Sequence, residues 1–370
     1  MFQNTLKNSL LLVVLMLLSV GMIMVYSSSS IVAEMDPATG SSYFFIKKQI
    51  LWMVISGIGL MLCSDISYKF FAKHAYTIFG ISLLTLILVL IPGIGVKYNG
   101  ARRWIRMAGM GIQPSDFTKL ACVLFIAAYM ERNYASIKNF YVGFLPVFSM
   151  VAFSCFLILL EPDLGTSLFI FSVSILLLLT GGIRWQHLMP LFLAGIPVFL
   201  ILAVFKLQHI YARIAIYLNP ELDPLGKGYQ IRQSLISIGS GGYFGLGLGS
   251  SQQKLFFLSE ESTDFIFAIL GEELGFLGTS LVLVLYIFFL YYGFRVVQKA
   301  PDIFSMLTAL GITLNLTLQS IFNIAVVTHT IPAKGISLPL ISFGGSGLFF
   351  TLIQIGILLN IADKCHQKNE

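Results

Sequence analysis

The chain has 370 residues, of which 57% are hydrophobic and only 11% charged, and its mean hydropathy is +0.87. This composition excludes a water-soluble globular domain and predicts an all-α, polytopic integral membrane protein. The formal net charge is +6, and we expect the membrane, not nucleic acid, to be the large partner of this basic chain.

Ten apolar stretches predict ten transmembrane helices. They cover residues 4–26, 49–64, 75–92, 115–130, 141–160, 164–181, 187–206, 264–293, 303–327 and 345–362. At about 20 residues per span they use roughly 200 residues, so we expect a single membrane domain over residues 1–370 and no separate soluble domain. The first stretch is too long for a signal-peptide core and lacks a small-x-small cleavage site, so it is expected to be retained.

An even number of spans places both termini on one side of the membrane. The loops on that side are short and basic, with Lys69, Lys73, Arg132, Lys138, Arg184, Arg295 and Lys299. The positive-inside rule therefore predicts that both termini are cytoplasmic. The first exterior loop is then 27–48, and the long extracytoplasmic loop is about 207–262.

The predicted exterior loops also carry basic residues. These are Lys97, Arg102, Arg103, Arg106, Arg213, Lys227, Arg232 and Lys254. Guanidinium groups match phosphate oxygens, so a phosphate ligand is one explanation. Attraction to anionic lipid headgroups is the other, and charge alone does not separate the two.

Motifs for nucleotide and metal cofactors are missing from the sequence. Neither G-x-x-x-x-G-K-[ST] nor G-x-G-x-x-G occurs, so no nucleotide site is expected. The five histidines have no helical i, i+4 pair and no cysteine partner, which argues against a histidine-based metal site. The energy for any reaction must therefore arrive with the substrate.

The stretch 258–278 concentrates acidic residues at the start of an apolar run. Its five acids are Glu260, Glu261, Asp264, Glu272 and Glu273. A carboxylate at the centre of a membrane helix costs about 2.5 to 3.5 kcal/mol, so these acids need partners or a water-filled cavity. The first two suit a helix start. Asp264 and Glu272 would lie roughly 12 Å apart along one helix, so both are expected to line one cavity.

Three shorter motifs interrupt the apolar stretches. Gln113 to Lys119 places Pro114 in a first helical turn and sets Asp116 and Lys119 at i, i+3, where a local ion pair is the alternative to a ligand site. Glu161 to Thr166 predicts a tight turn, with Asp163 at the start of the next helix, in a structural or a functional role. The small residues of 339–347 predict a broken helix that forms the far wall of the site.

Together these motifs resemble the SEDS family (shape, elongation, division and sporulation), which includes FtsW, RodA and SpoVE. The similar stretches are N-G-A-R-R-W-I at 99–105, Q-P-S-D at 113–116, E-P-D-L-G-T at 161–166, D-P-L-G-K-G-Y-Q at 223–230, S-I-G-S-G-G at 237–242, T-D-F-I-F at 263–267, E-E-L-G at 272–275 and I-S-F-G-G-S at 341–346. The form of 161–166 and the run 247–254 are most similar to FtsW. Ser262, Asp116 and Phe343 stand where the family usually has His, Glu and Tyr.

The resemblance implies a peptidoglycan glycosyltransferase that polymerises lipid II at the outer face of the bacterial cytoplasmic (inner) membrane. It implies a class B penicillin-binding protein as the cross-linking partner, alongside other divisome or elongasome proteins, and a role in septal wall synthesis. Asp264 would be the general base for the attacking sugar hydroxyl. The residues expected to bind the pyrophosphate are Arg102, Arg103, Lys119, Arg213 and Lys227. The residues expected to support the cavity are Trp104, Gln113, Asp116, Glu161, Asp163, Gln230, Thr263, Glu272, Ser342, Gly344 and Gly345.

No cofactor follows from the resemblance, although a divalent cation could accompany the pyrophosphate. The competing functions are a flippase for the lipid-linked precursor, a RodA-type polymerase of cell elongation, and a non-catalytic scaffold. A flippase needs a polar path to both faces, whereas the charges here gather toward the predicted exterior. A scaffold would leave the acids of 258–278 unexplained.

Overall fold

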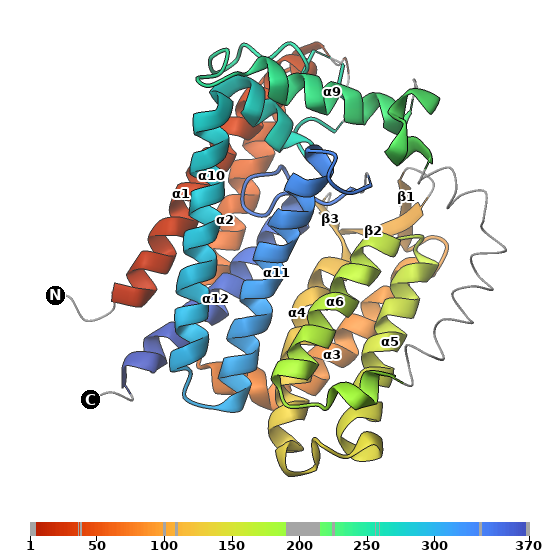
Figure 1. Cartoon of the computed structure of the whole chain (residues 1–370), viewed down its shortest axis with the longest axis vertical. Helices are drawn as coiled ribbons and strands as arrows, with labels where there is room; N and C mark the ends of the chain where they lie inside the picture. The colour runs from red at the N-terminus through yellow and green to blue at the C-terminus, as the bar shows by residue number, and fades with distance from the viewer. Residues whose placement is uncertain are drawn as a thin grey trace.

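A computed structural model describes residues 5–35, 37, 39–98, 101–107, 110–189, 215–223, 226–255, 257–258, 260–332 and 335–367. Most of these residues are helical (Figure 1). The long helices are α1 (Thr5–Met35), α2 (Phe44–Asp65), α3 (Tyr68–Leu90), α4 (Pro114–Arg132), α5 (Leu145–Leu160), α6 (Leu164–Thr180), α10 (Ile266–Lys299), α11 (Ile303–Val327) and α12 (Gly345–Gln367). The short ones are η1 (Tyr134–Ser136), η2 (Phe140–Phe144), η3 (Pro220–Leu222) and α9 (Lys227–Ser240).

The long helices coincide with nine of the ten predicted spans, and the chain is a multi-pass membrane protein. Among the described residues, seven helical stretches are long and apolar enough to cross a membrane, and α6 is a shorter apolar helix. The predicted span 187–206 lies almost wholly outside the described residues. The total of ten spans therefore stays a prediction.

The first predicted loop, 27–48, is wrong in its bounds, because α1 continues to Met35 and α2 already begins at Phe44. The serines after Tyr26 find partners within the helical bundle. Ser29 Oγ donates to the carbonyl of Val25 at 2.6 Å, one helical turn earlier. A serine hydroxyl bonded in this way does not end a helix.

The segment 95–112, expected as a loop, forms a small antiparallel sheet. Its strands are β1 (Gly95–Tyr98), β2 (Ala101–Met107) and β3 (Met110–Ile112), in the order β1-β2-β3. Val96 pairs with Trp104, and Ile105 pairs with Ile112. Such β-branched and aromatic cross-strand pairs stabilise a sheet.

The bundle has two distinct ends (Figure 1). The start of α1 and the end of α12 lie toward the end that we call the terminal end. The sheet, α9 and the segment 241–262 lie at the opposite end, which we call the sheet end. The helices with the most extensive mutual contacts are α2 with α12, α3 with α4, α10 with α11 and α1 with α10. Helices α11 and α12 are the most buried of the long apolar helices and α2 is the most exposed.

Helix α10 is broken at Gly275, whose φ of 65° and ψ of −161° are essentially restricted to glycine. The glycine-rich segment 242–247 repairs the break from outside the helix. The backbone bonds that do so run from Phe276 N to Gly242 O (2.9 Å), Leu277 N to Tyr243 O (3.2 Å), Leu246 N to Glu272 O (2.9 Å) and Gly247 N to Glu273 O (3.0 Å). The groups that the break would leave unpaired are thereby satisfied.

Candidate functional site

A polar cavity of about 30 Å³ lies between α4, α11, α12 and the segment 335–344, which directly precedes α12. This volume holds about two water molecules. Its polar lining residues are Asp116, Lys119, Asn315, Gln319, Ser337, Ser342, Thr351 and Gln354. The interrupted segment predicted as a wall also contributes Gly344, and α12 begins directly after it at Gly345.

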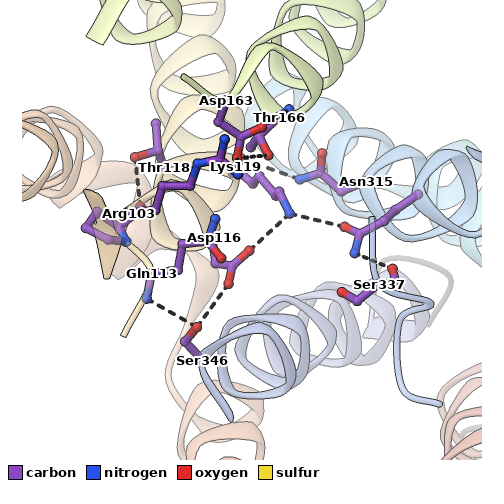
Figure 2. Close-up of polar contacts among 12 residues, drawn as sticks. Arg103, Gln113, Asp116, Thr118, Lys119, Asp163, Thr166, Asn315, Ser337 and Ser346 are labelled. Atoms are coloured by element: carbon purple, nitrogen blue, oxygen red, sulfur yellow. Dashed lines mark hydrogen bonds and ion pairs between the residues drawn. The ribbon is translucent and has the colours of Figure 1, made fainter. Parts of the chain in front are cut away.

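The predicted pair on α4 forms the centre of this cavity. Lys119 Nζ lies 3.1 Å from Asp116 Oδ1 and 3.3 Å from Gln319 Oε1 (Figure 2). Ser346 Oγ donates to Asp116 Oδ2 at 3.0 Å and accepts from Gln113 N at 3.2 Å. The local ion pair is therefore present, and the ammonium group keeps one further N–H for a ligand.

Asp264 lies in the turn before α10, two residues ahead of its first residue, Ile266. Its backbone carbonyl accepts from Asn323 Nδ2 at 2.8 Å. The preceding carbonyl, of Thr263, accepts from Ser342 Oγ at 2.6 Å. A wall residue of the cavity is thus joined directly to the peptide that carries Asp264.

The Asp264 carboxylate has no hydrogen-bond partner among the described residues. A Cβ added to Gly335 would stand 2.6 Å from its Oδ2, so the carboxylate packs closely against backbone. Burial, together with the smaller effect of the nearby charges of Glu260 and Asp163, raises the pKa of Asp264 to about 7. A carboxylate of this kind can accept a proton near neutral pH.

A second acidic group lies in the turn between α5 and α6. Asp163 caps α6 through Thr166 N at 3.1 Å, as the sequence predicted. Arg103 of β2 donates to the carbonyls of Glu161 (2.9 Å) and Pro162 (2.5 Å), and its Nη1 lies 3.8 Å from Asp163 Oδ2. Arg103 therefore stabilises this turn through two hydrogen bonds and an ion pair. Its guanidinium group retains further N–H donors for a ligand.

Both carboxyl oxygens of Glu161 are buried and lack a hydrogen-bond partner among the described residues. The pKa of Glu161 is raised to about 8, chiefly by burial; the charge of Asp163 also raises it, and the charge of Arg103 lowers it. Glu161 is therefore held as a neutral acid at neutral pH.

Glu272 was expected to share a cavity with Asp264, and the structure places it elsewhere. Its Oε2 accepts from Ser237 Oγ (3.0 Å) and Ser251 Oγ (2.5 Å), and its Oε1 accepts from Gln252 N (2.9 Å). The helical spacing used for the prediction does not apply, because Asp264 precedes α10. Glu272 is a buried anchor of the segment 237–252.

Glu273 forms an ion pair with Lys254, one of the basic residues of the predicted exterior loops. Lys254 Nζ lies 2.8 Å from Glu273 Oε1, and both side chains are fully buried. Ser27 Oγ of α1 donates to the other oxygen at 2.5 Å. The acids of α10 thus find their partners within the bundle, as burial of a charge requires.

The other predicted residues are distributed around the sheet end. Arg102 and Trp104 lie on β2, where the Trp104 ring packs against Gly111. Gly345 packs against the Trp52 ring of α2. Gln230 lies in the first turn of α9. Arg213 and the side chain of Lys227 lie outside the described residues.

Sequence reasoning missed three amides that line the cavity, Asn315 and Gln319 on α11 and Gln354 on α12, and a fourth on α11, Asn323, that is bonded to Asp264. A signal was present, since the three on α11 recur every four residues within an apolar helix. That spacing puts them on one face. Polar side chains on one face of a membrane helix mark an internal site.

Comparison with known proteins finds similarity along most of the chain. The family model described as cell cycle protein, for FtsW, RodA and SpoVE, matches residues 8–367. Over 354 residues the chain is 42% identical to stage V sporulation protein E of Bacillus subtilis (strain 168), covering 95% of this chain and 96% of that protein. It is 39% identical over 353 residues to a probable peptidoglycan glycosyltransferase FtsW of Trichlorobacter lovleyi, covering 95% and 92%.

Two solved structures share the fold. A chain from a peptidoglycan synthase complex that coordinates polymerization and crosslinking aligns with a TM-score of 0.77 and 26% identity, over 95% of this chain and 96% of that one. The rod shape determining protein RodA of Thermus thermophilus aligns with a TM-score of 0.65 and 25% identity, over 95% of each chain.

Proposed function

Because the chain belongs to the FtsW, RodA and SpoVE family of cell cycle proteins, we propose that it is a peptidoglycan glycosyltransferase that polymerises lipid II at the outer face of the cytoplasmic membrane. The whole chain, residues 1–370, would act as one membrane domain. Its similarity to relatives named FtsW favours a role in septal wall synthesis.

The proposal is carried by the carboxylate of Asp264, which has no hydrogen-bond partner among the described residues and follows a carbonyl bonded to Ser342, a wall residue of the cavity that contains Lys119. In the proposed reaction, a sugar hydroxyl of the acceptor attacks the anomeric carbon of the donor. The new glycosidic C–O bond forms as the bond to the pyrophosphate breaks, and Asp264 takes the hydroxyl proton. Its pKa of about 7 suits this transfer.

The leaving group is an undecaprenyl pyrophosphate, which needs cationic partners as it departs. Lys119 lines the cavity, and Arg103 of β2 contacts the turn that carries Asp163. Arg102, Arg213 and Lys227 are further candidates from the sequence. The cavity holds only about two waters, so we expect the sugars to bind at the sheet end and only small groups of the substrate to enter it.

A divalent cation could accompany the pyrophosphate. Among the described residues, no group of three or more His, Cys, Asp or Glu could hold a metal ion. A bound cation would therefore take pyrophosphate oxygens among its ligands. The proposed cross-linking partner is a class B penicillin-binding protein, acting with other divisome proteins.

The deciding experiment incubates the purified full-length protein with lipid II, alone and with candidate class B partners, and separates the products by size. Glycan polymer above the level of a boiled sample supports the proposal. Transfer of lipid II between leaflets of sealed vesicles without any polymer would instead indicate a flippase, and would overturn the proposal.

The proposed orientation places the sheet end outside the cell and both termini in the cytoplasm. Ser250 is exposed at the sheet end, whereas its neighbour Ser251 is buried against Glu272 and unsuitable for labelling. In a cysteine-free background, Ser41→Cys and Ser250→Cys should react with an impermeant thiol reagent on intact spheroplasts. Ser136→Cys, at the terminal end, should react only after lysis, and the reverse pattern would invert the orientation.

A further inference from the structure

Two amide side chains on α11 are hydrogen-bonded to the site, one to the ammonium group of Lys119 and the other to the backbone carbonyl of Asp264, and the mechanism above leaves them without a role. Gln319 and Asn323 lie four residues apart, on one face of the helix and at successive turns. Both project toward the segment 335–344, where they contact adjacent backbone carbonyls.

Asn323 uses its amide nitrogen twice. Its Nδ2 donates to the carbonyl of Asp264 at 2.8 Å and to the carbonyl of Ile336 at 2.6 Å. Both partners accept hydrogen bonds, so the orientation of the amide is fixed by its surroundings. Its Oδ1 is buried and has no partner among the described residues. The side chain therefore acts here solely as a double donor that ties Asp264 to the segment.

Gln319 uses both ends of its amide. Its Oε1 accepts from Lys119 Nζ at 3.3 Å, and its Nε2 donates to the carbonyl of Ser337 at 2.9 Å. These two partners again fix the orientation, because an ammonium group only donates and a carbonyl only accepts. Gln319 therefore ties the cavity lysine to the residue that follows Ile336.

The two amides thus donate to consecutive backbone carbonyls, those of Ile336 and Ser337. The same segment makes a second contact with the turn that carries Asp264. Ser342 Oγ donates to the carbonyl of Thr263 and accepts from Leu338 N at 2.7 Å. The backbone around Asp264 and the ammonium group of Lys119 are consequently both linked to residues 336–337, through side chains of α11.

We propose that Gln319 and Asn323 are positioning residues that set the separation and orientation of Asp264 relative to Lys119 across the cavity. This inference rests on the proposed function, in which Asp264 accepts the acceptor's proton and Lys119 stabilises the leaving pyrophosphate. The two groups act on different substituents of one anomeric carbon, so their relative placement matters. A displacement of about 1 Å at such a site can lower the rate by about 10²-fold.

The test replaces each amide with an apolar side chain of similar size, in the full-length protein with its class B partner. Asn323→Leu and Gln319→Met should each lower kcat for lipid II polymerisation by roughly 10- to 100-fold, with KM changed by less than about threefold. Thr317→Val is the matched control. Thr317 is buried on the same helix, and its hydroxyl bonds only the carbonyl of Thr313 within that helix. Its kcat should stay within about twofold of the parent.

A double-mutant cycle separates positioning from a purely structural role. If Gln319 acts through Lys119, then Gln319→Met should add no more than about twofold to the loss already caused by Lys119→Met. Because the two side chains are in direct contact, their effects on thermal stability are also expected to be non-additive, so kcat is compared only between variants that are fully folded at the assay temperature.

Parent-like kcat in both amide variants would overturn the inference, as would multiplicative losses in the cycle or a loss of kcat that merely follows unfolding. Each of these outcomes leaves the proposed function standing as long as the parent polymerises lipid II and Asp264→Asn does not. A parent without polymerase activity would contradict the proposed function itself.

Discussion

Asp264 and the pair Glu272 and Glu273 come from one acidic stretch and differ in how the fold treats their carboxylates. Glu272 accepts three hydrogen bonds, and Glu273 has an ion pair with Lys254 and a bond from Ser27. The carboxylate of Asp264 has no such bond among the described residues, although both carbonyls beside it are held.

This contrast shows that burial alone does not identify a proton acceptor. A buried carboxylate whose oxygens are occupied by fixed donors serves as an anchor. One whose backbone is fixed while its oxygens remain open is prepared for a substrate proton. The four predictions that follow test this distinction.

The largest effect is expected from Asp264→Asn, which keeps the shape of the side chain and removes its ability to take a proton. Polymerisation of lipid II should fall by about 10²- to 10⁴-fold, while thermal stability stays unchanged or rises slightly. Glu260 lies four residues earlier and is exposed, so Glu260→Gln should polymerise lipid II at a rate within a few fold of the parent at alkaline pH. Near-normal polymerisation by Asp264→Asn would remove it from the mechanism.

Lys254→Met should behave in the opposite way, as a stability variant. It leaves the carboxylate of Glu273 buried without its cation, which costs about 3 to 5 kcal/mol. The double variant Lys254→Met with Glu273→Gln should regain much of that loss, because no unpaired charge remains. Thermal denaturation of the purified proteins measures both, and equal stability of the single variant and the parent would argue against an anchoring role.

The third prediction concerns pH. An ionised base is required, so the rate should rise with pH through about 7, the pKa of Asp264. The negative charges of Glu260 and Asp163 help to raise that pKa, so Glu260→Gln and Asp163→Asn should each move the acidic limb to lower pH. A profile of kcat/KM against pH would show this, and an unmoved limb would indicate that another group titrates.

The smallest effect is expected from Glu161→Gln, as a change in how stability depends on pH. Burial raises the pKa of Glu161 from an ordinary 4.5 to about 8, so the folded protein binds this proton more tightly than the unfolded chain. The contribution of Glu161 to the free energy of unfolding is therefore fully present below about pH 4.5 and is lost as the pH rises through about 8. The variant should melt a few degrees above the parent at pH 9 and equally at pH 5. Parallel melting curves would show that Glu161 does not carry the proton.

Hydropathy placed the long helices because a membrane span is a local property of about 20 residues. The pair Asp116 and Lys119 and the cap Asp163 were predictable for the same reason, since spacings of three residues are decided within one helical turn. The interruption before α12 was also visible, in its run of small residues.

Contacts between distant segments were not predictable in this way. The partners of Glu272 and Glu273 lie in α1, in α9 and in the segment 249–254, and a single sequence gives no register between them. The sheet at 95–112 is not evident from the sequence, because its strands are short and glycines lie in and between them. Asn323 sits within an apolar helix, and its tie to Asp264 depends on how α11 packs.

The break at Gly275 also bears on how the chain enters the membrane during synthesis. A span that starts after Gly275 and ends at Lys299 is roughly 36 Å long at about 1.5 Å per residue, which suffices for a hydrocarbon core of about 30 Å. The insertion machinery would then meet an uninterrupted apolar helix, with Glu272 and Glu273 already behind it. The glycine-rich segment 242–247, which bonds the backbone groups at the break, is synthesised before this helix. It therefore already lies on the side of the membrane where the helix begins.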